Sequence, residues 1–438
     1  MAANTPAETT DLLAYIEASP SPWHCVAETE RRLKEAGFSA VAEDGADWPT
    51  ETGARCYTVR GGGSLIAWRV GSSDPKEGGF RIIGAHTDSP NLRVKPQPDI
   101  KRAESWLIGV EPYGGVLQAT WTDRDLGIAG RVSLRSEGDT LQVESRLLRI
   151  DRPICRIPNL AIHLNRTANS EGLKLNEQKH LPALWSLARG KRAEEGEHFR
   201  NFIADELGVE PSRILGWDLC LYETVPPCVA GVDGEFIHAP RLDNQASCHA
   251  ALEALLTTAG EDSASTQVIA LFDHEEIGSR TSRGAASSFL RDVLTRLSGE
   301  RASDLARAIT HSFIVSADMA HGHHPNYTDK HDAQHKPLLN GGPVLKTHNE
   351  WRYASDAEDS AVWRGLCADA GVPLQEFVNR SDLRCGSTIG PIVSAELGIR
   401  GVDVGCAMYS MHSIREMAGS EDQPLMIAAM SQFLRWVG

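Results

Sequence analysis

VIALFDHEE, at residues 268–276, changes abruptly from an apolar run to four polar residues. The run Val268–Phe272 is short and bounded by polar residues, which predicts a buried strand. The same change recurs at three other places: Phe80–Ala85 leads into His86-Thr87-Asp88, Phe313–Val315 is followed by Asp318, and the strand near Val402 is followed by His412. In open α/β sheets, sites form at the carboxyl ends of the strands. The pattern therefore predicts an α/β fold with one site assembled from distant segments.

The polarity pattern of the sequence changes at residues 95–234. Arg131–Leu134 and Leu141–Glu144 alternate in polarity, and Glu137-Gly138-Asp139 between them predicts a hairpin turn. The chain of 438 residues is also longer than one domain usually is. We therefore expect a catalytic domain in two parts, residues 1–94 and 235–438, interrupted by a strand-rich insertion at residues 95–234.

Three helices are predicted in the catalytic domain. Thr9 or Thr10 is expected to cap a first helix, and Cys25–Ala36 fits a second. Asn244–Thr257 has small and apolar residues at helical spacing, which predicts a third.

The bulk composition argues against several classes of function. Lys and Arg number 44 against 59 Asp and Glu, and the resulting charge of −15 disfavours nucleic acid and anionic membranes as partners. Nine scattered cysteines without C-x-x-C spacing indicate free thiols in a reducing compartment. The N-terminus lacks a basic and apolar leader, and no apolar run is long enough to span a membrane, so we expect a cytoplasmic protein.

Five side chains have the chemistry of metal ligands: His86, Asp243, Glu276, Asp318 and His412. Imidazole and carboxylate suit zinc, manganese or cobalt. Five ligands are too many for one tetrahedral zinc, but they suit two ions if Asp243 bridges them. Asp243 also precedes the helix expected at residues 244–257, so a helix N-cap is an equally good interpretation of that residue alone.

The neighbour of one ligand has a different expected role. Two metal ions would acidify a shared water to hydroxide, and Glu275 would act as its general base, a role that contributes about 10²- to 10⁴-fold in rate. Asp88 would hold the second nitrogen of His86 and fix its tautomer. Taken alone, a Glu-Glu pair is usually a solvated charge and a His-x-Asp is usually a surface pair; the prediction depends on their occurring together after strands.

Together these residues resemble the aspartyl aminopeptidase family of metallo-aminopeptidases. The matching stretches run in family order from residue 85 to residue 416: AHTDSP (85–90), DRDLGIAGRV (123–132), IPNLAIHLNR (157–166), RLDNQAS (241–247), DHEEIGS (273–279), SADMAHGHHPNY (316–327), KTHNEWRYAS (346–355) and MHSIRE (411–416). The sequence departs from the family at Leu117–Thr120, where aromatic or histidine residues are usual.

The resemblance implies a central mixed sheet flanked by helices, as in zinc exopeptidases, with an inserted dimerisation domain. It implies that the five ligands bind two divalent ions per subunit, most often Zn²⁺ with Co²⁺ or Mn²⁺ as substitutes, and that a bridging hydroxide attacks with Glu275 as base. It also implies dimers that build a tetrahedral homododecamer.

The expected substrates are peptides, with a preference for N-terminal Asp or Glu. The resemblance assigns substrate contacts to His163, His321, Lys346 and Tyr353, with His163 reaching a neighbouring subunit's site, and the substrate amine would bind Glu275 or Asp318. His323 and His324, which invite a third metal site, are better interpreted as surface or structural residues. Alternatives are a broader aminopeptidase for neutral residues, an amidase or deacylase on the same scaffold, and a carrier particle without catalysis.

Overall fold

The chain forms two compact units in a computed structural model that describes residues 5–138, 140–194, 196–299 and 301–438. The catalytic unit comprises the described parts of Met1–Asp88, Pro227–Met411 and Glu416–Gly438. The insertion unit comprises the described parts of Ser89–Pro226, together with the short segment His412–Arg415. The sequence-based limits of 95–234 lie six to eight residues from these bounds, and they did not anticipate that residues 412–415 group with the insertion.

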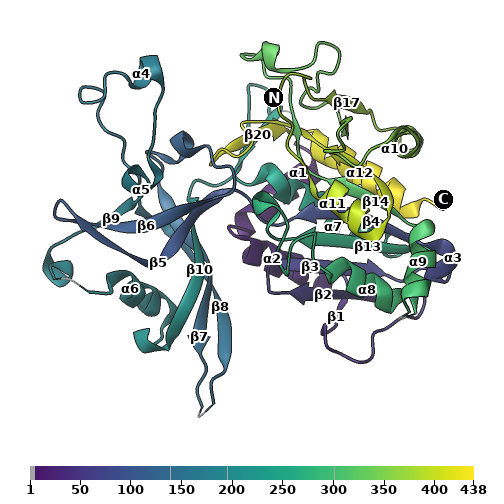
Figure 1. Cartoon of the computed structure of the whole chain (residues 1–438), viewed down its shortest axis with the longest axis horizontal. Coiled ribbons are helices and arrows are strands. Elements are labelled where there is room, and N and C mark those ends of the chain that lie inside the picture. Colours follow the sequence, from purple (N-terminus) through teal and green to yellow (C-terminus); the bar gives the residue numbers. More distant parts are fainter. Residues whose placement is uncertain (1–4, 139, 195, 300) are drawn as a thin grey trace. The chain divides into compact units, whose positions relative to one another are not determined.

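A nine-stranded mixed sheet is the centre of the catalytic unit (Figure 1). Its strands, in spatial order, are β1 (Ser39–Ala40), β2 (Arg55–Arg60), β3 (Ser64–Arg69), β13 (Thr266–Phe272), β4 (Phe80–His86), β14 (Phe313–Ala317), β18 (Arg400–Gly405), β16 (Val344–Thr347) and β17 (Gln375–Val378). The four central strands β13, β4, β14 and β18 are mutually parallel. Their carboxyl ends therefore meet at one edge of the sheet, as the apolar runs predicted.

Side chains in each strand alternate between the two faces of this sheet. Helices cover both faces. One face packs residues such as Leu65 and Ile83 against five helices: α1 (Ala7–Ala18), α2 (Pro22–Glu35), α7 (Leu242–Thr258), α10 (Ala357–Asp369) and α12 (Asp422–Arg435). The other packs residues such as Ile66 and Ile82 against α8 (Phe289–Ser298), α9 (Ala302–Thr310) and α11 (Ile389–Leu397). The central strands are buried on both sides, which is why they are almost continuously apolar.

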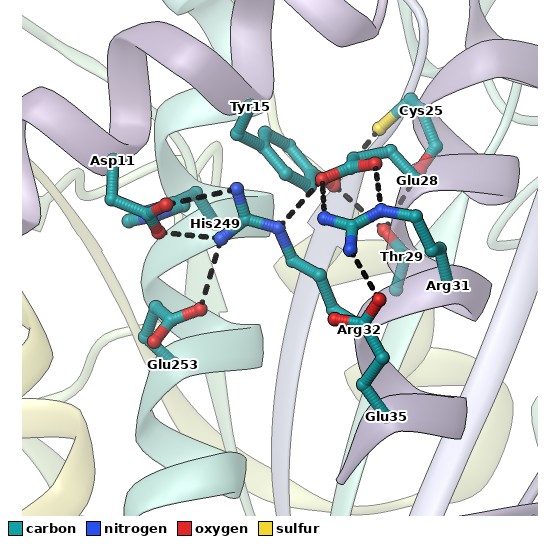
Figure 2. Close-up of polar contacts among 10 residues, drawn as sticks. All are labelled: Asp11, Tyr15, Cys25, Glu28, Thr29, Arg31, Arg32, Glu35, His249 and Glu253. Atoms are coloured by element: carbon teal, nitrogen blue, oxygen red, sulfur yellow. Dashed lines mark hydrogen bonds and ion pairs between the residues drawn. The ribbon is translucent and has the colours of Figure 1, made fainter.

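The N-terminal helices are joined to α7 by a polar cluster (Figure 2). Arg32 on α2 donates from Nη1 to Asp11 on α1 at 2.5 Å and to Glu253 on α7 at 3.2 Å. His249 on α7 contacts the same Asp11 carboxylate through Nε2 at 2.8 Å. The expected cap at Thr9 or Thr10 is wrong: α1 begins at Ala7 after Pro6, whose fixed φ suits a helix start.

A small five-stranded sheet completes the catalytic unit. Its order is β11 (Cys228–Ala230), β12 (Phe236–Ala239), β20 (Glu416–Gly419), β19 (Ala407–Tyr409) and β15 (Ala320–His321). β15 follows the end of β14 by two residues, so this sheet continues from the site edge of the larger one.

The insertion unit is built on a six-stranded antiparallel sheet. Its order is β8 (Val143–Cys155), β7 (Leu126–Arg135), β10 (Ile214–Glu223), β5 (Asn91–Arg102), β6 (Ser105–Tyr113) and β9 (Ala183–Leu187). Helix α6 (His198–Leu207) packs Phe199 and Ile203 into its core, and two single-turn helices, α4 (Ala168–Glu171) and α5 (Glu177–His180), lie between β8 and β9. The expected hairpin joins β7 to β8, with Ser136 N–H donating to the Gln142 carbonyl at 2.9 Å; Asp139 lies outside the described residues.

None of the helices in the described residues has both the length and the apolar character needed to span a membrane.

Candidate metal centre

His86 is the last residue of β4, and it is the point at which the predicted ligands of the catalytic unit converge. Its imidazole is 1% exposed. The Nε2 atom lies 3.4 Å from Asp243 Oδ1, 3.7 Å from Asp318 Oδ1 and 4.0 Å from Glu275 Oε2. These carboxylates come from the start of α7, the end of β14 and the end of β13. The edge of the sheet therefore brings together side chains that are 32 to 232 residues apart in the sequence.

Asp88 positions both sides of this cluster. Its backbone carbonyl lies 3.0 Å from His86 Nδ1, closer than its carboxylate Oδ1 at 3.5 Å. The carboxylate instead accepts from the N–H of Glu275 at 3.1 Å and of Glu276 at 3.2 Å. The sequence predicted that Asp88 would orient His86. It did not predict that the same residue would also hold the backbone of the glutamate pair.

Asp243 lies in the irregular first turn of α7, not at its N-cap position. The N-cap of α7 is Arg241, with φ of +58°, and Asp243 itself has non-helical φ and ψ. Its N–H donates to Glu416 Oε2 at 3.1 Å, and Asn244 donates through Nδ2 to the Ala317 carbonyl at 2.8 Å. The irregular first turn therefore directs the Asp243 carboxylate to His86, and Glu416 supports it. Sequence reasoning missed Glu416, although it is the last residue of the MHSIRE stretch.

Glu275 and Glu276 lie in the turn that follows β13. His274 has φ of +68°, and a short 3-10 helix, Glu275–Ile277, follows it. Two groups of donor atoms fall within 4.8 Å of one another: His86 with Asp243 and Asp318, and His86 with Glu275 and Glu276. Both glutamates therefore reach the centre, and distance alone does not separate a ligand from a base.

The electrostatics of the cluster favour a cation. Burial raises the pKa of Glu275 to about 8, with the carboxylates of Asp318 and Asp88 adding to the effect and His86 opposing it. Burial, and next the Asp243 carboxylate, raise the pKa of Glu276 well above its ordinary range. Burial lowers the pKa of His86, but hydrogen bonds to Asp243, Asp318 and Asp88 outweigh it and raise that pKa. Crowded carboxylates with too little positive charge are the environment that a divalent cation neutralises, so the donor set fits metal ions.

Lys346, on β16, lies beside Asp318. Its ammonium donates to the Asp318 carbonyl at 2.8 Å and approaches Asp318 Oδ2 at 3.8 Å, and the side chain is 3% exposed. The same nitrogen lies 5.1 Å from the centre of the Tyr353 ring. His321 follows on β15 and interacts electrostatically with Lys346 and Asp318. Three of the predicted substrate residues thus gather around Asp318.

Two predicted residues belong to the insertion unit. His163 is exposed in a turn. His412 belongs to the segment that groups with this unit, where its Nδ1 lies 3.1 Å from the Gly115 carbonyl and its own carbonyl accepts from Leu117 N–H at 3.1 Å. The structure describes how His412 is held within the insertion unit, and its metal ligation stays a prediction.

Among the described residues of the catalytic unit, one further group has donor atoms at metal-binding separation: Asp11, His249 and Glu253. The Arg32 guanidinium already donates to both of its carboxylates (Figure 2). Gln423 Nε2 lies 2.8 Å from His249 Nδ1, so both ring nitrogens of that histidine have partners. We therefore interpret this group as an ion-pair cluster, not as a metal site.

Comparison with known proteins shows the family of this chain. The family model described as aminopeptidase I zinc metalloprotease (M18) matches residues 15–434. The probable M18 family aminopeptidase 2 of Pseudomonas aeruginosa strain LESB58 is 48% identical over 427 residues, covering 96% of each chain. Two solved structures are also similar. The Ape4 chain of an Ape4–Nbr1 complex has a TM-score of 0.93 at 35% identity and covers 99% of this chain and 88% of that one. The S. cerevisiae mApe1 dodecamer has a TM-score of 0.85 at 30% identity and covers 97% of this chain and 95% of that one. This chain belongs to the M18 family of zinc aminopeptidases.

Proposed function

We propose that this aminopeptidase binds two divalent metal ions per subunit, with His86, Asp243, Glu276, Asp318 and His412 as ligands and Asp243 as the bridge. Zn²⁺ is the ion that the family description favours, and Co²⁺ or Mn²⁺ would suit the same donors. The observation that carries the proposal is the buried group of carboxylates around His86, where burial and the neighbouring carboxylates raise the pKa of Glu275 and Glu276. When bound, such ions polarise the scissile carbonyl and bring the pKa of a shared water towards neutrality.

Glu275 is the general base in this proposal. It accepts the proton of the attacking water and returns it to the departing amine. Its raised pKa and its position 4.0 Å from His86 Nε2 suit a group that exchanges protons beside the ligands. Asp88 accepts from the backbone N–H of both the base and the ligand Glu276, which ties these two residues to one carboxylate.

Substrate selection is proposed to involve Lys346, His321 and Tyr353, which surround Asp318. The amine of the substrate would bind Glu275 or Asp318, and an imidazole, His321 or His163, would stabilise the oxyanion. Lys346 donates to the carbonyls of Asp318 at 2.8 Å and Met319 at 3.3 Å, which leaves one of its three N–H groups for an Asp or Glu side chain.

A second specificity is also supported. The Lys346 ammonium is almost wholly buried and already has two carbonyl partners. An ammonium in that position stabilises Asp318 whether or not a substrate carboxylate is present. This observation favours an aminopeptidase with broad specificity that includes neutral residues.

Self-association is proposed to complete the site. The turn that carries His163 exposes Leu160, Ile162 and Leu164, which are 59%, 48% and 74% exposed. Three exposed aliphatic side chains around one histidine suit a surface that another subunit covers. The mApe1 relative is a dodecamer. We propose that the insertion unit forms dimers, that dimers build a tetrahedral homododecamer, and that the protein works in the cytoplasm, where its free thiols persist.

The test uses the purified protein with aspartyl, glutamyl and leucyl arylamides, and with N-acylated amino acids as blocked substrates. The proposal expects activity on free amino termini, highest on aspartyl and glutamyl substrates if Lys346 selects them. Activity only on blocked substrates would instead identify an amidase or deacylase.

The variant Glu275→Gln separates the base from the ligands. We expect it to retain the metal content of the wild type and to lose at least about 10² in turnover. Unchanged turnover would remove Glu275 from the proposed mechanism.

A further inference from the structure

Side chains that have no part in the proposed chemistry contact the turn that carries Glu275 and Glu276. His274 reverses the chain with φ of +68°, a conformation that a residue with a side chain seldom adopts. Its carbonyl accepts from Ser279 N–H at 2.8 Å, and the Glu275 carbonyl accepts from Gly278 N–H at 2.8 Å. The directions of both glutamate side chains therefore depend on how His274 is fixed.

Both ring nitrogens of His274 have partners within the loop that follows. Nδ1 lies 2.7 Å from Thr281 Oγ1, and Arg283 donates from Nη2 to Nε2 at 3.0 Å. A guanidinium only donates, so Nε2 must be the acceptor. Nδ1 is then the nitrogen that donates, and Thr281 Oγ1 accepts that hydrogen bond. Thr281 Oγ1 also accepts from Gly284 N–H at 3.1 Å, which closes the loop on itself.

Arg283 connects this ring to the rest of the sheet. Its Nη1 donates to the Gly61 carbonyl at 3.1 Å, and its Nε lies 3.5 Å from the Oδ2 of Asp273, a fully buried carboxylate. Ser64 donates from Oγ to the Arg283 carbonyl at 2.8 Å and accepts from Asp273 N–H at 2.9 Å. One guanidinium thus contacts the residue before the turn, the first residue of the turn and the β2–β3 hairpin.

The hairpin is shaped for this contact. A Cβ atom at Gly61 would overlap the Arg283 side chain, and a Cβ atom at Gly63 would overlap the Asp273 carboxylate. Gly63 also accepts through its carbonyl from Thr87 Oγ1 at 2.7 Å, and Thr87 lies between His86 and Asp88. The two glycines allow the hairpin to approach both the loop and the strand end that carries His86.

We infer that Arg283, acting through His274, is a positioning residue that sets the direction of Glu275 and Glu276. This inference rests on the proposed role of Glu275. Arg283 does not itself reach the donor atoms around His86. A shift of about 1 Å in a reacting group can cost on the order of 10² in rate. Loss of Arg283 should therefore lower kcat more than it raises KM.

The experiment uses the metal-loaded, full-length protein with Arg283→Ala. We expect kcat to fall by roughly 10- to 100-fold with KM within about threefold of wild type and with metal content unchanged. Ethylguanidinium, which can occupy the space left by the side chain, should restore part of kcat. Arg291→Ala is the matched control, because Arg291 makes an ion pair with Glu396 in which both side chains are about half exposed. Its kcat should match wild type and should not respond to ethylguanidinium.

Two results would overturn the inference. The first is an unchanged kcat in Arg283→Ala. The second is a loss of kcat that ethylguanidinium does not restore while metal content also falls, which would indicate that Arg283 only supports the fold. If Arg283→Ala does not fold, Arg283→Lys serves instead; it keeps the charge but not the fork of donors, and wild-type kcat in it would equally contradict the inference.

The Glu275→Gln variant distinguishes this failure from failure of the proposed function. If Glu275→Gln is inactive while Arg283→Ala is fully active, only the positioning role is wrong. If Glu275→Gln is fully active, the base assignment is wrong whatever Arg283 does.

Discussion

Two clusters in the catalytic unit contain the same kinds of donor but have opposite electrostatics. Around His86 the carboxylates are crowded, and the pKa of Glu275 is raised to about 8. Around His249 the carboxylate of Asp11 has a pKa well below its usual range, because of its hydrogen bond to His249 and then its pairing with Arg32, which together outweigh burial. A histidine with two acidic neighbours therefore does not define a metal site. The two clusters differ in whether a side chain of the protein supplies the positive charge next to the carboxylates, as Arg32 does in the second cluster.

Position in the fold agrees with this distinction. The His86 cluster lies where parallel strands end, and its members come together from four separate segments. The Arg32 cluster joins the flanks of three helices, where α1, α2 and α7 pack (Figure 2). The first arrangement gathers side chains from separate segments into one site, whereas the second joins three helices to one another.

The largest expected effect is on metal binding. Asp243→Ala should remove bound zinc from the protein and lower turnover by well over 10², because the bridging carboxylate would be lost. His249→Ala, in the second cluster, should keep its zinc. Metal analysis after gel filtration measures both. Zinc loss in His249→Ala, or zinc retention in Asp243→Ala, would remove the distinction between the clusters.

Metal removal should reveal the crowding as a dependence of stability on pH. In the folded metal-free protein the pKa of Glu275 is about 8, against an ordinary 4.5, so folding favours the protonated form. This contribution is present at low pH and is lost as the pH rises towards 8, by roughly 2 to 4 kcal/mol. Thermal unfolding of chelated protein from about pH 5 to about pH 8 should show a falling Tm, and zinc should abolish the slope. A flat profile without metal would show that burial and the neighbouring carboxylates do not raise the pKa of Glu275.

The smallest effect is expected in the second cluster. Arg32→Ala leaves Asp11 and Glu253 without their shared donor, which should cost about 1 to 3 kcal/mol in unfolding free energy. Specific activity of the folded fraction should be unchanged. Denaturant unfolding and an activity assay on the same sample measure the two quantities. Arg32→Ala with reduced activity and normal stability would mean that this cluster belongs to the site after all.

The central strands were predictable because both their faces are buried. Val268–Phe272 was predicted and β13 is Thr266–Phe272; Phe313–Val315 was predicted and β14 is Phe313–Ala317. A short, continuous apolar run between polar residues is typical of a strand that is covered on both sides. Because these strands are parallel, the polar residues that follow them meet, which is how sequence alone brought His86, Glu275 and Asp318 together.

Features that depend on long-range polar contacts were not predictable. Arg32 pairs with Asp11 and Glu253, which are 21 and 221 residues away, and no local pattern announces such a pairing. The irregular start of α7 is also invisible to helical periodicity, because Arg241 and Asp243 have the composition of an ordinary helix start. The roles of the individual ligands stay predictions until metal is measured.

The position of β4 has a consequence for how the protein is made. Its two neighbours in the sheet are β13 and β14, so both edges of this buried strand stay unpaired until the ribosome has passed residue 266. Synthesis of residues 87–265 at about 5 to 20 residues per second takes on the order of ten seconds or more. Throughout that interval the nascent chain exposes an apolar strand with free edges, so it should depend on chaperones more than the finished enzyme does.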